Sequence, residues 1–154
     1  MMSFDDIKKL PVGRISDDNS LLFIWVVSPS LDEGIATLKT WGFEYATVAF
    51  VWHKQRINPG YYTLSSCELC LVGKRGKIPQ PRGARNIEQF LSCLKTQHSK
   101  KPREVRNRIS KMFPIQNKIE LFARPDRQLH LDGSNTFDGW SVWGNEVEGD
   151  NIFA

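Results

Sequence analysis

Leu21-Leu-Phe-Ile-Trp-Val-Val27 and Ala46-Thr-Val-Ala-Phe-Val-Trp52 are two apolar runs rich in β-branched and aromatic residues. Runs of this kind are typical of strands that are covered on both faces, as in a parallel sheet. Between them, residues 31–41 repeat large apolar side chains at helical spacing, and Gly42 stands where a helix C-terminal cap is expected. Strand, helix and strand in succession predict an α/β sandwich with a mostly parallel sheet.

The rest of the chain supplies further elements around this unit. Strands are predicted over 67–72 and 118–124, a helix from Pro102 to before Pro114, and an edge strand over 140–145. Loops are predicted over 53–66, 73–85 and 126–138, and 90–94 is ambiguous between strand and helix. In such folds ligands bind beyond the C-terminal ends of the strands. The candidate site residues, which are named below, lie at these strand ends.

Length and composition fit one domain over residues 1–154. The chain is 40% apolar, enough to build a core, and its net charge is +4. No run approaches the roughly 20 apolar residues of a membrane span, and the N-terminus lacks the pattern of a signal peptide. We therefore expect a cytoplasmic protein with no membrane partner.

Positive charge gathers in two parts of the sequence, although a net charge of +4 fits many soluble proteins as well as a nucleic-acid partner. The first group is Lys74, Arg75, Lys77, Arg82 and Arg85, and the second is Lys100, Lys101, Arg103, Arg106, Arg108 and Lys111. The clustering of these cations is a better indication of a nucleic-acid partner than the net charge is.

A zinc site built from Cys67, Cys70, Cys93 and His98 is an alternative for the three cysteines. Cys67 and Cys70 lie three apart in a predicted strand, so their side chains point to opposite faces and cannot chelate one ion. We therefore expect free thiols and no metal.

The C-terminal part of the chain, from Lys101 on, holds the groups that a nucleotide-like ligand needs. Arg124 and Lys101 can bind a carboxylate, Asn145 and Glu146 can hydrogen-bond ribose hydroxyls, and Phe122 beside Glu120 can supply an apolar wall. Spacing alone indicates an anionic or nucleotide ligand at a strand-end cleft. The alternative is that the charged residues form ordinary surface pairs and that the tryptophans belong to the core.

Three motifs carry a resemblance to a known family: Gln97-His-Ser-Lys-Lys-Pro102, Lys118-Ile-Glu-Leu-Phe-Ala-Arg124 and Gly139-Trp-Ser-Val-Trp-Gly-Asn-Glu146. With them the chain resembles the adenine-N6 methyltransferases, which include the catalytic subunit that modifies mRNA adenosines and many phage and bacterial relatives. The resemblance implies a Rossmann-like fold and an S-adenosylmethionine pocket. The positions that it assigns to the cofactor are Lys101, Glu120, Phe122, Arg124, Asn145 and Glu146.

The resemblance continues upstream in order and covers nearly the whole chain. It implies a nucleic-acid substrate, with DNA preferred over RNA, that would be contacted by Lys54, Tyr61, Tyr62, Lys74 and Arg75. The eukaryotic enzymes place His and Asn shortly after the arginine, where this chain has Asp126 and Arg127. Those two contacts are therefore not carried over.

The family's catalytic Asp-Pro-Pro-Trp motif occurs nowhere in this sequence. In the family the motif orients the adenine amine toward the sulfonium methyl, and its strand lies centrally in the sheet. Asn58-Pro-Gly-Tyr61 is a poor match, because it lacks the second proline and lies in the loop that gates the substrate. The resemblance thus implies a methyltransferase domain that is N-terminally incomplete relative to the family, with one central strand missing and its catalytic residues unknown.

Three functions remain open on the sequence. The first is adenine-N6 methyl transfer with the missing segment or a partner subunit supplied from elsewhere. The second is a catalytically inactive relative or truncated form that binds the cofactor, a nucleic acid or a partner subunit. The third is an unrelated α/β nucleotide-binding protein.

Overall fold

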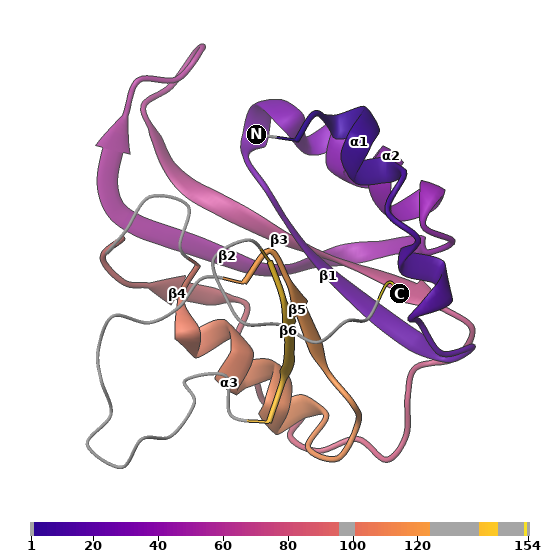
Figure 1. The fold of residues 1–154 in the computed structure, drawn as a ribbon. Coiled ribbons are helices and arrows are strands. Elements are labelled where there is room, and N and C mark those ends of the chain that lie inside the picture. The colour runs from indigo at the N-terminus through magenta and orange to yellow at the C-terminus, as the bar shows by residue number, and fades with distance from the viewer. Residues whose placement is uncertain (1, 96–100, 124–138, 145–152, 154) are drawn as a thin grey trace. The chain divides into compact units, whose positions relative to one another are not determined.

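A computed structural model of the chain describes residues 2–95, 101–123, 139–144 and 153 (Figure 1). The chain divides into two compact units, Met1–Pro114 and Ile115–Ala154. The first contains a four-stranded sheet and the second a two-stranded sheet. The single domain expected over 1–154 stays a prediction.

The strand, helix and strand predicted from the two apolar runs are confirmed. They are β1 (Ser20–Val26), α2 (Leu31–Thr40) and the first half of β2 (Glu44–Asn58). Gly42 follows the helix with a φ of 90°, a left-handed conformation that glycine adopts without strain. Gly34 lets α2 approach β1 closely, because a Cβ at that position would overlap a methyl group of Val26.

The sheet of the first unit is mixed, so the mostly parallel sheet is not confirmed. Its strand order is β1-β3-β2-β4, where β3 is Ser65–Arg75 and β4 is Phe90–Ser92. β3 runs antiparallel to both neighbours, and only the β2–β4 pair is parallel. β1 and β2 therefore run in the same direction, as their connecting helix predicts. They are not neighbours, because β3 lies between them.

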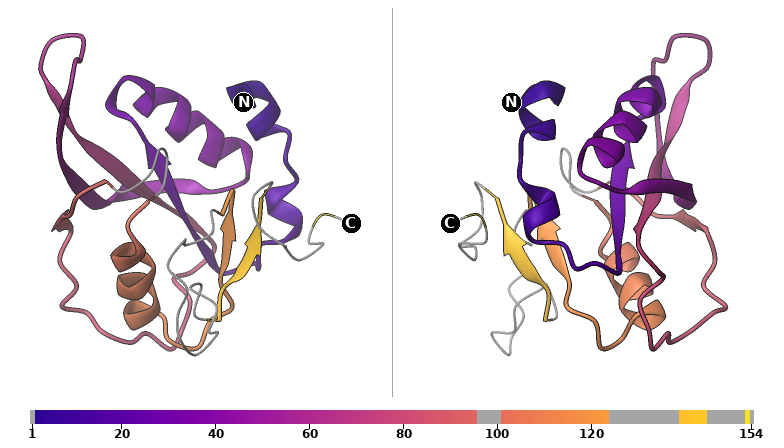
Figure 2. Two further views of the ribbon diagram at one scale, coloured as in Figure 1. Left: turned by 60° about the vertical axis from the view of Figure 1, so that its left-hand side comes forward. Right: turned by 90° about the vertical axis from the view of Figure 1, so that its right-hand side faces the viewer.

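The prediction of a loop over 53–66 is wrong for much of this range. β2 continues to Asn58 and β3 begins at Ser65, and these two residues pair across a long hairpin. β3 also extends through Arg75, into the segment predicted as a loop. Figure 2 shows the end of this hairpin extending beyond the rest of the sheet. β2 and β3 thus continue beyond their apolar residues, because their backbones pair with each other.

One face of the four-stranded sheet is covered by a helix (Figures 1 and 2). α2 packs on this face with α1 (Phe4–Lys8), and Lys8 bonds Glu33 at 2.8 Å. α3 (Arg103–Met112) begins beyond the other face, with Pro102 as its N-cap, close to the predicted start. Short 3-10 turns span Val12–Arg14 and Ser28–Ser30.

The second unit contains β5 (Ile119–Leu121) and β6 (Ser141–Trp143), which pair in parallel. Both strands fall where they were predicted. Ala123 and Val142 are buried, and Trp140 packs against them. Phe122 adopts a positive φ of 59° directly after β5. The loop predicted over 126–138 lies outside the described residues.

Among the described residues, no helix has both the length and the apolar character that crossing a membrane requires.

Candidate functional site

A buried carboxylate between two lysines is the centre of the candidate site. Glu68 contacts Lys54 with 3.7 Å between Nζ and Oε1, and it accepts a hydrogen bond from Lys101 Nζ at 2.5 Å. The side chains of Lys54 and Glu68 are 6% and 7% exposed, whereas that of Lys101 is 26% exposed. The cluster therefore carries a net positive charge, with one of its two cations within reach of solvent.

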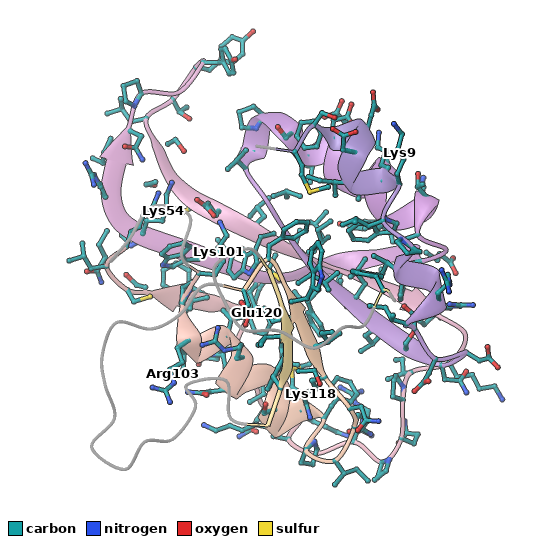
Figure 3. The ribbon with its side chains drawn as sticks, in the orientation of Figure 1. Lys9, Lys54, Lys101, Arg103, Lys118 and Glu120 are labelled. Atoms are coloured by element: carbon teal, nitrogen blue, oxygen red, sulfur yellow. The ribbon has the colours of Figure 1, made fainter. Side chains whose placement is uncertain are left out.

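Strand register explains why these residues meet. Glu68 on β3 lies directly opposite Trp52 on β2, and Lys54 is two residues further along the same strand. Residues two apart on a strand share a face, so Lys54 lies beside Glu68. Lys101 approaches the same face from the segment just before α3, as Figure 3 shows for Lys54 and Lys101.

Two tryptophans form an aromatic wall beside the ions. The Nζ of Lys101 lies 5.6 Å from the centroid of the Trp25 ring, within the range of a cation–π contact. Trp25 meets Trp52 edge to face at 6.0 Å, and Trp52 Nε1 donates to the carbonyl of Cys93 at 3.0 Å. These rings lower the local polarity, which strengthens the attraction between the charges.

Cys70 lies near this site without taking part in its chemistry. Its side chain is fully buried, and burial raises the pKa of its thiol to about 12, an effect that nearby Lys101 partly opposes. The thiol is therefore protonated at neutral pH and is no nucleophile. Cys67 and Cys70 are both on β3, as predicted, and their spacing places them on opposite faces.

The raised pKa of Cys70 predicts a loss of stability at alkaline pH. The unfolded thiol ionises near its ordinary pKa of 9.0 while the folded thiol stays protonated, so stability is intact below pH 9 and falls above it. Between pH 8 and pH 10 this thiol alone should cost about 1.4 kcal/mol of unfolding free energy.

Urea unfolding of Cys70→Ala should show a fall with pH that is smaller than that of the wild type by this amount. The matched control is Cys93→Ala, which leaves the buried thiol in place and keeps the wild-type fall. Equal falls in the wild type and Cys70→Ala would contradict the assignment.

Of the other residues that are predicted to bind the cofactor, only some are among the described residues. Glu120 is half-buried on β5, and Phe122 is 44% exposed and meets Trp143 edge to face at 5.3 Å. Arg124, Asn145 and Glu146 lie outside the described residues, as does His98. Lys118 begins the predicted motif, and burial lowers the pKa of its ammonium group.

Lys74 and Arg75 were predicted to contact the substrate together with Lys54, but they lie at the opposite end of β3 from Glu68. The six residues from Glu68 to Lys74 span about 20 Å of strand. Arg75 pairs with Ser20 at the start of β1, and its guanidinium donates to the carbonyls of Gly13 and Ser16. The structure thus gives Arg75 a role in holding the N-terminal segment.

Tyr61 and Tyr62 are at the exposed end of the β2–β3 hairpin. Their exposed fractions are 85% and 101%, and Ile57 and Leu64 beside them are 63% and 67% exposed. The hairpin from 45 to 67 contains Lys54 and Arg56 and no carboxylate. An apolar, aromatic and cationic segment is therefore presented to solvent at a distance from the core.

Glu68 is the functional candidate that sequence reasoning missed. It falls within the strand predicted over 67–72 and receives no role there, although an acidic residue inside an apolar strand is itself a signal. Acidic side chains are rarely buried unless they are paired, so Glu68 required a cationic partner from elsewhere in the fold.

Comparisons with known proteins agree with the motifs. The protein-family model MT-A70 matches residues 1–146. The chain is 46% identical over 151 residues to the type II methyltransferase M.MunI of a Mycoplasma species, an alignment that covers 98% of this chain and 60% of that protein.

Eukaryotic relatives are more distant. The chain is 31% identical over 160 residues to the human N(6)-adenosine-methyltransferase catalytic subunit METTL3, covering 94% of this chain and 24% of the relative. It is 30% identical over 156 residues to the N(6)-adenosine-methyltransferase MT-A70-like protein of Drosophila melanogaster, covering 96% and 24%. The chain thus spans between a quarter and three fifths of the length of these relatives.

Proposed function

The chain belongs to the MT-A70 family, and on this basis we propose that it takes part in S-adenosylmethionine-dependent methyl transfer to the N6 amine of adenine in DNA. The preference for DNA over RNA is supported by the higher identity to a bacterial type II methyltransferase than to the N(6)-adenosine-methyltransferases. Because the chain covers only part of those proteins, the activity is proposed for this domain together with whatever completes it.

The observation that carries this proposal is the Lys54–Glu68–Lys101 cluster. An ammonium group has three donors, and the carboxylate of Glu68 takes one from Lys101. Two cations face one carboxylate, so a second carboxylate would balance the charge of the cluster. The methionine part of S-adenosylmethionine has such a carboxylate, which makes Lys101 a suitable donor for it.

Bound S-adenosylmethionine supplies an electrophilic methyl group on a sulfonium centre. The residues of this chain would bind and orient. Lys101 would hold the carboxylate end, Trp25 and Trp52 would exclude water from the ions, and Glu68 would fix the position of the Lys101 ammonium group. Glu120, Phe122, Arg124, Asn145 and Glu146 are proposed as further cofactor contacts on the strength of the family motifs.

The substrate would be contacted by the β2–β3 hairpin. Tyr61 and Tyr62 can stack on bases, and Lys54 is on the strand that connects the hairpin to the cofactor cluster. The position of Lys74 and Arg75 at the far end of β3 separates them from this group. If they contact nucleic acid, they would do so at a second point on the molecule.

A Rossmann-like fold with one central strand missing is also part of the proposal. Among the described residues, β1 pairs only with β3, so its other edge has no strand partner. Residues 20–25 of this apolar strand are only half-buried. Exposed apolar edges favour pairing with another strand, so we propose that β1 accepts a strand that carries the catalytic motif.

The edge of β1 that has no strand partner among the described residues also favours the second candidate function. A domain without the catalytic motif can still bind the cofactor or a nucleic acid, as an inactive relative or as one subunit of a complex. The two functions share the same cofactor cluster and differ in whether methyl transfer occurs.

Cofactor binding tests the site directly. Lys101→Ala and Arg124→Ala should each weaken binding of S-adenosylmethionine by about 10- to 100-fold, since a hydrogen bond to a charged group contributes about 1.5–3 kcal/mol. Isothermal titration calorimetry measures the affinities. Lys77→Ala, an exposed lysine outside the proposed site, should bind as the wild type does. Unchanged affinity in both site variants would reject the assignment.

A further inference from the structure

Positive charge is concentrated in one part of the chain. The segment 82–113 holds nine of the 21 lysines and arginines but only two of the 17 acidic residues. The remainder of the chain therefore has twelve basic against fifteen acidic residues and a net negative charge. The net positive charge of the protein thus comes from this segment. A surface that is charged only for solubility would carry both signs interspersed.

The fold brings Arg82 and Arg85 of the first basic group next to the second basic group. The backbone amides of Gly83 and Ala84 donate to the carbonyls of Met112 and Lys111, each at 2.7 Å. A Cβ at Gly83 would overlap the Lys111 carbonyl oxygen, so only glycine fits this approach. Arg82 stacks its guanidinium over the ring of Phe113 at 5.5 Å. Residues 82–85 are thereby fixed against the C-terminal turn of α3.

Three of the four cations of α3 are accessible to solvent. Lys111 is exposed and Arg103 and Arg106 are partly exposed, whereas Val105 and Ile109 are buried beneath the helix. The side chain of Arg108 is only 18% exposed. Figure 3 shows Arg103 pointing away from the sheet. The helix contains four cations and one acidic residue, and that residue, Glu104, pairs with Arg108 at 3.3 Å.

This α3 basic surface is defined by the residues that share it, which are Arg82, Arg85, Arg103, Arg106 and Lys111. Arg108 also donates to the carbonyls of Glu88 and Phe90, each at 2.9 Å, and so fixes the helix beside β4. Contacts within the fold thus hold the helix and residues 82–85 beside each other. The ligand whose charge is complementary to such a basic surface is a polyanion.

The α3 basic surface begins at the candidate site. Lys101, which binds Glu68, is two residues before the first helical residue, Arg103. A helix of ten residues is about 15 Å long, the axial length of about four base pairs. A nucleic acid whose adenine reached the Lys101 cluster could thus follow the helix with its flanking phosphates.

We propose that the α3 basic surface binds the phosphate backbone of the DNA that flanks the target adenine. This inference rests on the proposed function and adds to it the element that positions the substrate. Phosphate contacts of this kind fix register and orientation without reading sequence. They also make affinity depend steeply on salt, because each neutralised phosphate releases counterions.

The test is a salt series of duplex binding by the full chain. Arg103→Gln/Arg106→Gln/Lys111→Gln is compared with the wild type by fluorescence anisotropy of a labelled adenine-containing DNA duplex between about 50 and 200 mM salt. We expect the slope of log affinity against log salt to become shallower by about two to three, with binding on the order of tenfold weaker at the lowest salt.

The matched control removes exposed lysines from the opposite helical layer. Lys9→Gln/Lys39→Gln should leave the salt slope unchanged, because α1 and the end of α2 are not part of the surface. Circular dichroism melts should show that both variants fold. A triple variant with the wild-type slope, or a control with the same loss of slope, would overturn the inference while leaving the proposed function intact. A wild type that binds S-adenosylmethionine but no duplex would overturn both the inference and the DNA substrate.

Discussion

Replacing Glu68 with alanine should lower the free energy of unfolding by about 3–5 kcal/mol. The reason is the lysine that remains. Lys54 is 6% exposed, and among the described residues Glu68 is the carboxylate that pairs with it, so the variant leaves a buried ammonium group that has lost this opposite charge. Lys101 is better able to reach water, since a quarter of its side chain is exposed. For a chain of this length the loss corresponds to a fall in Tm of roughly 10 °C.

Two further variants separate the buried charge from ordinary side-chain loss. Lys54→Met/Glu68→Ala should recover much of the stability, because the uncompensated cation is gone. Glu104→Ala removes an exposed carboxylate that also pairs with a basic residue, and it should cost no more than about 0.5 kcal/mol. Denaturant unfolding measures all three. A Glu68→Ala variant that loses no more than Glu104→Ala would show that the cluster does not stabilise the fold.

Most elements of the fold could be predicted because their signals are local. The apolar runs, the helical period of 31–41 and the proline before α3 each report on their own segment. The order of the strands could not be predicted in this way. β3 enters between β1 and β2 because it forms a hairpin with β2, and nothing in the separate strands shows which neighbour they will choose.

The same limit explains the error at 53–66. Asn58-Pro-Gly60 does mark a reversal of the chain, but polar residues on either side of it are held in strands by cross-strand pairing. Asn58 pairs with Ser65 even though neither segment has an apolar pattern. A turn signal therefore locates the end of a hairpin more reliably than it locates the ends of the strands.

Two of the three residues of the Lys54–Glu68–Lys101 cluster could be predicted as site residues from the sequence. Lys54 and Lys101 are assigned to substrate and cofactor from separate motifs, and their meeting on Glu68 depends on the segment just before α3 reaching β3. That arrangement is a matter of packing between distant segments. Lys74 and Arg75 show the converse, since residues close to Glu68 in sequence lie about 20 Å from it along an extended strand.

Methyl transfer to adenine by the 154-residue chain alone should not exceed background, whereas supplying the catalytic motif should raise it by on the order of 10³-fold or more. The exocyclic amine is a weak nucleophile because its lone pair is delocalised into the ring. The family resemblance assigns its orientation to an Asp-Pro-Pro-Trp segment, which this sequence does not contain. The assay is transfer of radiolabelled methyl groups from S-adenosylmethionine to an adenine-containing duplex.

The informative variant is a fusion protein in which a strand-forming segment ending in Asp-Pro-Pro-Trp is placed ahead of residue 1. Two changes are expected together. Turnover should appear, and Tm should rise, because a strand paired with β1 satisfies the edge that has no strand partner among the described residues and covers part of its half-buried apolar side chains. The same fusion with alanine in place of the aspartate should keep the gain in Tm and lose the turnover. Strong activity of the unfused chain would show that the acceptor for the adenine amine is already encoded within these residues, and the proposed role of the β1 edge would then be wrong.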